Sequence, residues 1–271
     1  MRFLAAVVAA VIVQSAPLTE VLHRPLDQIL DVYVRDGLVY YRAVKTERGR
    51  LDRYAASLNV SPETYAGWSR EQQMAFWLNA YNVFVIQTVI DNYPIKGRSD
   101  AYPASSIRQI SGAFERTKHR AAGRSVTLDE IEKTILPEFK EPRLYLALGR
   151  GAVGSGRLRS EAYTGDRLMN QLDAVQADFM TRRTMIRIDQ ASSIMSLTPI
   201  ISWRESEFVA AYDKGDIGPF ARRSPIERAV IAFITPRLLP LEKEFVAKND
   251  FRVVFHPFDW RLNDLTGGRP D

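Results

Sequence analysis

The sequence predicts an α+β protein that is mainly helical, with a small antiparallel or mixed sheet. Segments with apolar residues at helical spacing outnumber segments that alternate like strands. The chain shows no regular alternation of strands and helices, which disfavours a doubly wound parallel sheet. Its 271 residues, 46% of them hydrophobic, suffice for one good-sized core, and no linker-like tract divides them.

The first predicted helix covers residues 26–35, where apolar residues recur at helical spacing until Gly37. A second helix starts at the capping box Ser69–Gln72 and ends near Pro94. It is apolar nearly all round, so we expect it inside the protein. Asn79 and Asn82 interrupt this apolar surface one turn apart, and buried amides need hydrogen-bond partners.

The remaining elements follow from capping signals, helical spacing and strand-like alternation. They are a short helix from the Thr127–Glu130 capping box to Pro137, a strand over 144–148, a helix from Asp166, a hairpin of 184–188 with 194–197, helices after Thr198-Pro199 and Ser224-Pro225, and a last strand over 252–255.

Residues 1–16 are typical of a secretory signal. Arg2 precedes an apolar run that ends at the small residues Ser15 and Ala16. The run is well short of the roughly 20 apolar residues that span a bilayer. We therefore expect a protein exported to the periplasm or the medium, with no transmembrane segment in its mature chain.

The composition excludes several kinds of site. The chain has no cysteine, which rules out a disulfide and a thiolate nucleophile. Its formal charge is only +5 and its basic residues are scattered in short groups, so we expect no nucleic-acid partner. No spacing of histidines and carboxylates is typical of a metal site, and we expect no metal and no cofactor.

Gly149, Gly151 and Gly154 have the Gly-x-Gly-x-x-Gly spacing of a dinucleotide-binding turn. That turn needs a helix directly after the glycines, because the pyrophosphate binds free N–H groups at the helix N-terminus. The next predicted helix starts only near Asp166. The glycines therefore predict a flexible loop and no nucleotide ligand.

Several short blocks occur in one order along the chain: VRDGLVYY (34–41), FWLNAYN (76–82), SIR (106–108), TLDEIE (127–132), PRL (142–144), LRSEAY (158–163), SW (202–203) and FDWRLN (258–263). Together these blocks resemble the exported bacterial members of the family called domain of unknown function 547. The resemblance implies a single domain over residues 17–271, loosely associated with papain-like or transglutaminase-like folds. The family has no established activity.

The sequence departs from this family where typical members carry cysteine and histidine. Arg150 and Ser155 stand at the two cysteine positions, and Lys133 and Tyr145 stand at two histidine positions. Gly156-Arg157 replaces a proline pair. Thiol catalysis and soft-metal binding need the missing residue types, so the resemblance implies a site that has lost its chemistry.

Ser155 replaces the thiol only if a base and a carboxylate lie beside it. The sequence allows Ser155, His256 and Asp259 as such a set, because His256 shortly precedes the block that contains Asp259. Ser155 lacks the Gly-x-Ser-x-Gly elbow of serine hydrolases. A histidine that is hydrogen-bonded elsewhere or faces solvent is the alternative.

Candidate ligand-binding residues are polar or aromatic and lie in the shared blocks or beside the glycines. They are Asn79, Asn82, Tyr145, Arg159, Trp260 and Asn263. The alternative is that the amides join helix ends and the terminal loop to the core.

The leading hypothesis is an exported protein without catalysis that binds a ligand or an envelope partner. One alternative is a hydrolase or acyl-transferase that uses Ser155. Another is a structural protein of the envelope.

Overall fold

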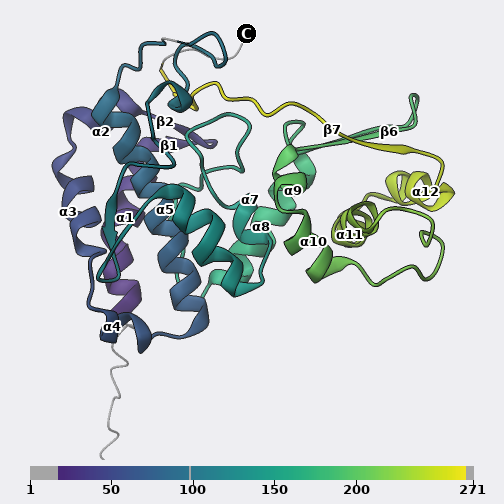
Figure 1. Cartoon of the computed structure of the whole chain (residues 1–271), viewed down its shortest axis with the longest axis horizontal. Coiled ribbons are helices and arrows are strands. Elements are labelled where there is room, and N and C mark those ends of the chain that lie inside the picture. The colour runs from purple at the N-terminus through teal and green to yellow at the C-terminus, as the bar shows by residue number, and fades with distance from the viewer. Residues whose placement is uncertain (1–17, 98, 267–271) are drawn as a thin grey trace, which may run out of the picture.

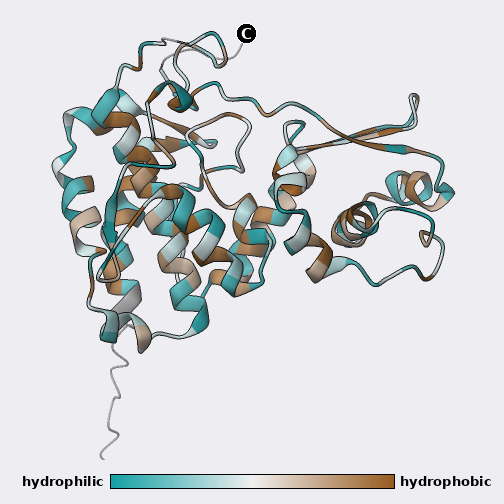
Figure 2. Cartoon of the chain, viewed as in Figure 1, coloured by the Kyte–Doolittle hydropathy of each residue, from teal (hydrophilic) through white to brown (hydrophobic). Residues whose placement is uncertain are grey.

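The computed structural model describes residues 18–97 and 99–266, so the predicted signal over 1–16 lies outside the described residues. Figure 1 shows the N-terminal helices on one side of the molecule and the C-terminal helices with a sheet on the other. The last segment of the chain returns to the first side. Figure 2 shows hydrophobic residues beside hydrophilic ones in both groups of helices.

The first described helix, α1 (Leu18–Tyr33), starts and ends earlier than the predicted helix over 26–35. Val34–Arg35 (β1) and Leu38–Val39 (β2) form an antiparallel hairpin instead of a helix end. The turn residues between them have φ angles of 51° and 82°, the left-handed backbone of a two-residue hairpin turn. The glycine after the predicted helix therefore belongs to a turn and does not end a helix.

The central helix α5 (Arg70–Asn92) confirms the predicted buried helix. Its N-terminus carries the predicted capping box, in which Ser69 accepts from the Gln72 N–H and Gln72 accepts from the Ser69 N–H. Nearly every side chain from Met74 to Ile90 is buried. The longer helices that pack on it are α1, α2 (Tyr41–Thr46), α3 (Gly49–Ser57) and α8 (Leu168–Thr181), and the short helical turns over 128–130 and 136–139 also contact it. The short α4 (Pro62–Ala66) leads into its start.

The segment after α5 contains a hairpin of β3 (His119–Ala121) and β4 (Arg124–Val126), which the sequence did not reveal. The Thr127–Glu130 capping box is confirmed and begins α6 (Leu128–Glu130). The helical path then continues as a π turn over 131–135 and a 3-10 turn over 136–139. Pro137 lies in the first turn of the 3-10 segment, where its missing N–H has no partner to lose, so it does not end the helix as predicted.

The prediction of a strand over 144–148 is wrong, because Arg143–Leu146 form one helical turn, α7. Leu144, Tyr145 and Leu146 are all buried. A short run that is buried on all sides lacks the periodicity that separates a strand from a helix. The predicted helix from Asp166 is confirmed by α8.

The C-terminal part confirms the predicted hairpin and last strand. β5 (Ile186–Asp189) pairs antiparallel with β6 (Ile194–Leu197), and β7 (Arg252–Phe255) pairs parallel with β6. Between β6 and β7 come α9 (Pro199–Trp203), α10 (Glu205–Tyr212), α11 (Pro225–Ile234) and α12 (Pro240–Lys248). The predicted class, mainly helical α+β with a small mixed sheet, is confirmed.

The segment after β7 crosses back over the molecule to the N-terminal hairpin (Figure 1). There Val39 pairs with Asp264, and the Val39 N–H donates to the Asn263 carbonyl at 2.8 Å. The buried apolar side chains form one connected cluster that extends from Leu26 to Leu262. No helix in the described part of the chain is long and apolar enough to cross a membrane.

Candidate functional site

The glycine loop, residues 149–156, follows α7 and is held on one side by α5. The Asn82 side chain accepts from the Gly149 N–H at 2.8 Å and donates to the Ala147 carbonyl at 3.3 Å. Asn79 bonds both main-chain groups of Tyr163, at 2.9 and 2.8 Å. The two predicted amides are thus buried links between α5 and the segment around the loop, and contact of either with a ligand stays a prediction.

The other side of the glycine loop is held by the C-terminal segment 259–263. The Val153 N–H donates to the Arg261 carbonyl and the Gly154 N–H to the Asp259 carbonyl, both at 2.9 Å. A Cβ atom at Gly154 would lie 2.7 Å from the Asp259 nitrogen, so only glycine allows this approach. The loop is therefore bonded on both sides, whereas the sequence predicted a flexible connection.

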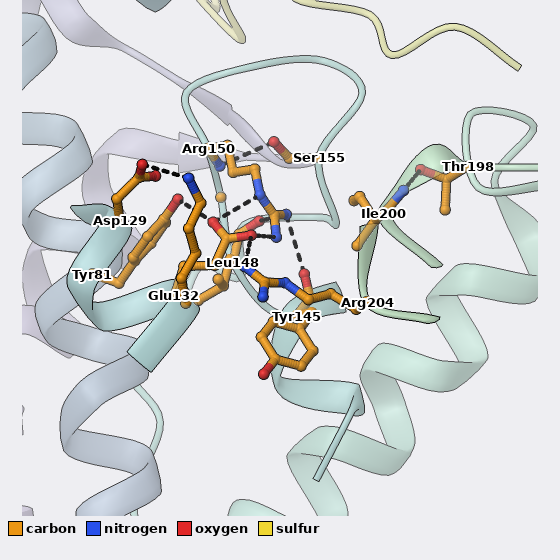
Figure 3. A network of polar contacts seen from close by, with 12 residues as sticks. Tyr81, Asp129, Glu132, Tyr145, Leu148, Arg150, Ser155, Thr198, Ile200 and Arg204 are labelled. Carbon is orange, nitrogen blue, oxygen red and sulfur yellow. Dashed lines mark hydrogen bonds and ion pairs between the residues drawn. The ribbon is translucent and has the colours of Figure 1, made fainter. Parts of the chain in front are cut away.

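Arg150 points from the glycine loop into the core and forms a two-pronged ion pair with Glu132 (Figure 3). Its side chain is 2% exposed, and its Nη2 and Nε atoms lie 2.7 and 3.2 Å from the two carboxylate oxygens. Nη1 donates to the Tyr145 carbonyl at 3.1 Å, and the Tyr81 hydroxyl donates to the same carboxylate at 3.0 Å. The buried charges are thus surrounded by hydrogen-bond partners.

The two charges keep each other ionised. Burial alone would raise the pKa of Glu132, but the Arg150 guanidinium holds this pKa below its ordinary value. Burial likewise works against the charged form of Arg150, and Glu132 raises the pKa of the guanidinium. Both groups are charged at neutral pH, as the pairing of buried charges requires.

A second arginine, Arg204 between α9 and α10, extends this network toward the surface. Its Nη2 lies 3.3 Å from Glu132, and its Nη1 lies 3.6 Å from Glu207. Its guanidinium covers the Tyr145 ring at 4.7 Å, and the Tyr145 hydroxyl donates to Glu207 at 3.2 Å. Burial raises the pKa of Tyr145, so the phenol stays a neutral donor.

Four residues stand where typical family members carry cysteine or histidine, and their surroundings in the fold differ. Arg150 and Tyr145 belong to the buried network, and Lys133 forms a surface ion pair with Asp129. Ser155 is 2% exposed, and its hydroxyl accepts from the Arg150 N–H at 2.9 Å. A hydroxyl in this position stabilises the turn of the glycine loop.

His256 contacts residues of the sheet and its edge. Its Nε2 donates to the Thr184 carbonyl at 3.0 Å, which leaves Nδ1 to accept from the Ser196 hydroxyl at 3.3 Å. Both oxygens of Asp259 bond Arg261, and this contact lowers the pKa of Asp259 against the effect of burial. No hydrogen bond among the described residues joins Ser155, His256 and Asp259. Asp259 is joined by its carbonyl to the N–H of Gly154, the neighbour of Ser155, and the catalytic use of these residues stays a prediction.

Asn263 is buried and joins the C-terminal segment to the N-terminal hairpin. It accepts from the Tyr41 hydroxyl at 2.7 Å and donates to the Gly37 carbonyl at 2.9 Å. Its amide thus bonds one side chain and one main-chain group near the N-terminal end of the chain. A structural role accounts for these contacts, and ligand contact by Asn263 stays a prediction.

Arg159 lies in an open polar cleft of about 580 Å³ between α1 and α8. It pairs with Glu161 at 2.5 Å, and the neighbouring Arg157 pairs with Asp36 at 3.2 Å. The arginines of this cleft are thus balanced by carboxylates. Among residues 18–97 and 99–266, no group of three or more histidine or acidic side chains is arranged to hold a metal ion.

Trp260 is half-buried and rests on Arg108, whose guanidinium carbon lies 4.6 Å from the indole and 4.3 Å from the Phe114 ring. Phe258 and Trp203 lie beside it, with ring centroids 4.5 and 6.3 Å from Trp260. The predicted residue is therefore one member of an aromatic cluster at the molecular surface.

Sequence reasoning missed Glu132, Arg204 and Trp203 as members of these two sites. Glu132 and Trp203 lie in the shared blocks TLDEIE and SW, but the spacing of residues in these blocks does not indicate which side chains they contact in the fold. A buried carboxylate needs a cation, and only the fold places Arg150 and Arg204 beside it.

These features define a class: a mainly helical α+β protein whose glycine loop holds a buried ion pair. Residues 65–180 match the model of the family described as "Protein of unknown function, DUF547", which confirms the resemblance predicted from the sequence. This range includes α5, Glu132, the glycine loop and all but the last residue of α8, and it ends before the three-stranded sheet. No curated protein and no solved structure matched the chain.

Proposed function

We propose that the protein is exported and binds a ligand or partner of the cell envelope, without catalysis at the glycine loop. The observation that carries this proposal is the Arg150–Glu132 ion pair. A thiol site needs a thiolate and a base, whereas a guanidinium is always protonated and has no lone pair to offer. The ion pair and its hydrogen bonds fill the place where such chemistry would need free groups.

The surroundings of Ser155 support the same proposal. Its hydroxyl is buried and already accepts from the Arg150 N–H. A serine nucleophile needs a base within hydrogen-bond reach, and His256 is bonded to Thr184 and Ser196 instead.

A fluorophosphonate probe tests the absence of serine catalysis. We expect no labelling of the purified protein, and the same background signal for Ser155→Ala. Ser202 is the matched control, because it is a partly exposed serine that bonds only the Pro199 carbonyl. Labelling that is lost in Ser155→Ala and kept in Ser202→Ala would overturn the proposal.

That outcome would favour a hydrolase or acyl-transferase. One contact supports this second candidate: the Gly154 N–H donates to the Asp259 carbonyl, which brings the serine loop against the segment of the proposed carboxylate. Catalysis would then require His256 to leave Ser196 and turn toward Ser155.

Export is proposed from the sequence of residues 1–16. Intact-mass analysis of protein recovered from the cell envelope should give an N-terminus after Ser15 or Ala16. Protein that keeps Met1 and stays in the cytosol would contradict the proposed location.

A further inference from the structure

Trp203, Phe258 and Trp260 form an aromatic surface at the junction of α9 and the segment that follows β7. Trp203 is 44% exposed, and the other two are half-buried. The Trp203 and Phe258 ring centroids lie 5.0 Å apart, and the two indole planes are within 19° of parallel. Clustered aromatic rings at a surface mark a binding site more often than single exposed ones.

The aromatic surface is fixed from beneath. The Arg108 guanidinium lies over Trp260 and over the buried Phe114, two rings that meet edge-on at 6.0 Å, and it forms an ion pair with Glu115 at 2.7 Å. Tyr102 meets the Trp260 ring edge-on at 6.0 Å. A ring held in this way loses little conformational freedom when a ligand stacks on it.

Polar groups lie beside the rings. Arg261 and Asp259 form a two-pronged pair, 47% and 26% exposed, in the same segment as Trp260. Neither indole N–H donates a hydrogen bond to any residue within 18–97 or 99–266. The aromatic surface thus combines partly exposed aromatic rings, indole N–H donors without a partner in the described part of the chain, and a carboxylate acceptor within one small area.

We propose that the aromatic surface binds a saccharide chain. A sugar ring presents weakly positive C–H groups that fit the negative face of an aromatic ring. Its hydroxyl groups both donate and accept, so they use the indole N–H groups, the Arg261 guanidinium and the Asp259 carboxylate together. This inference rests on the proposed function and names the ligand class of the envelope partner.

Two other ligands that stack on aromatic rings fit less well. A proline-rich peptide offers carbonyl acceptors to the indoles, but its proline residues lack N–H groups for the Asp259 carboxylate. A quaternary ammonium group would meet the positive charge of Arg108 directly behind Trp260.

The test is a calorimetric titration of the purified full chain with the hexasaccharides of glucose and of N-acetylglucosamine, and with a decaproline peptide. We expect binding of at least one hexasaccharide with a Kd between roughly 10 µM and 1 mM. Trp203→Ala should weaken this binding at least about tenfold. The matched control is Phe255→Ala, since Phe255 is 36% exposed and has no ring contact among the described residues.

Three results would overturn the inference: neither hexasaccharide binds, Trp203→Ala and Phe255→Ala bind equally well, or only decaproline binds. A circular dichroism spectrum of each variant checks that a loss of binding is not a loss of fold. Failure of the saccharide test still leaves another envelope ligand for the proposed function. Serine labelling at Ser155 would overturn the proposed function without touching the saccharide result.

Discussion

The glycine-loop site and the aromatic surface use polar and aromatic groups in opposite ways. At the glycine loop, Arg150 is 2% exposed and its charge is bonded to Glu132 and to main-chain carbonyls. At the aromatic surface, Trp203 is 44% exposed and its indole N–H has no partner among the described residues. The hydrogen bonds of the glycine-loop site stabilise the fold, whereas the aromatic surface has N–H donors that remain available to a ligand.

This difference follows from burial. A charge in the core is tolerated only when its partners are all within the protein. A ring at the surface costs little to leave unpaired, because water solvates its N–H group. The polar groups of the glycine loop are bonded within the protein, whereas the aromatic surface leaves groups accessible to a ligand.

The largest effect is expected when the buried pair is broken. Arg150→Met should lower the free energy of unfolding by about 3–5 kcal/mol, because it leaves the Glu132 carboxylate buried without its main partner. The double variant Arg150→Met/Glu132→Leu should recover most of this loss, since two apolar side chains need no pairing. Urea unfolding of the three proteins measures both values. A single variant within about 1 kcal/mol of wild type would show that water reaches the site.

A smaller effect is expected for the link between α5 and the glycine loop. Asn82→Ala leaves the Gly149 N–H and the Ala147 carbonyl without their partner, and should cost about 2 kcal/mol of unfolding free energy. Asn92→Ala is the matched control, because Asn92 is exposed and bonds only the Thr88 carbonyl of its own helix. Equal losses in the two variants would argue against a rigid glycine loop.

The ion pair also predicts how stability depends on pH. The pKa of Glu132 is lower in the folded protein than its ordinary value of 4.5, so the unfolded chain binds this proton more readily. The contribution of the pair is therefore complete above pH 4.5 and is lost as the pH falls through the folded pKa. Urea unfolding at pH 7 and pH 3 should show a larger loss for the wild type than for the double variant. Parallel losses would mean that Glu132 does not contribute.

The smallest effect on stability is expected at the aromatic surface. Trp203→Ala should change the free energy of unfolding by no more than about 1 kcal/mol, as most surface substitutions do. The same change at Trp77, which is fully buried and donates to the Tyr65 hydroxyl, should cost about 3–5 kcal/mol. Thermal melts of the two variants compare these values. A large loss for Trp203→Ala would place this ring in the core rather than at a binding surface.

Elements that depend on near neighbours in the chain could be predicted from local sequence patterns. The capping boxes at Ser69 and Thr127 join residues three apart, and the apolar surface of α5 is a property of its own residues. The same holds for the hairpin of β5 and β6, whose alternating residues lie close in the chain. Local rules of spacing and capping are sufficient in these cases.

The remaining features depend on how distant segments of the chain pack together. The run 144–148 is buried throughout and starts as a helical turn that ends at Leu146, which its own pattern does not reveal. Glu132 and Arg150 meet across the core, and Gly154 meets Asp259 from more than a hundred residues away in the sequence. The aromatic surface likewise joins Trp203 to Trp260 across the whole C-terminal part. Such pairs are set by how helices and strands pack, and packing depends on contacts that no local pattern contains.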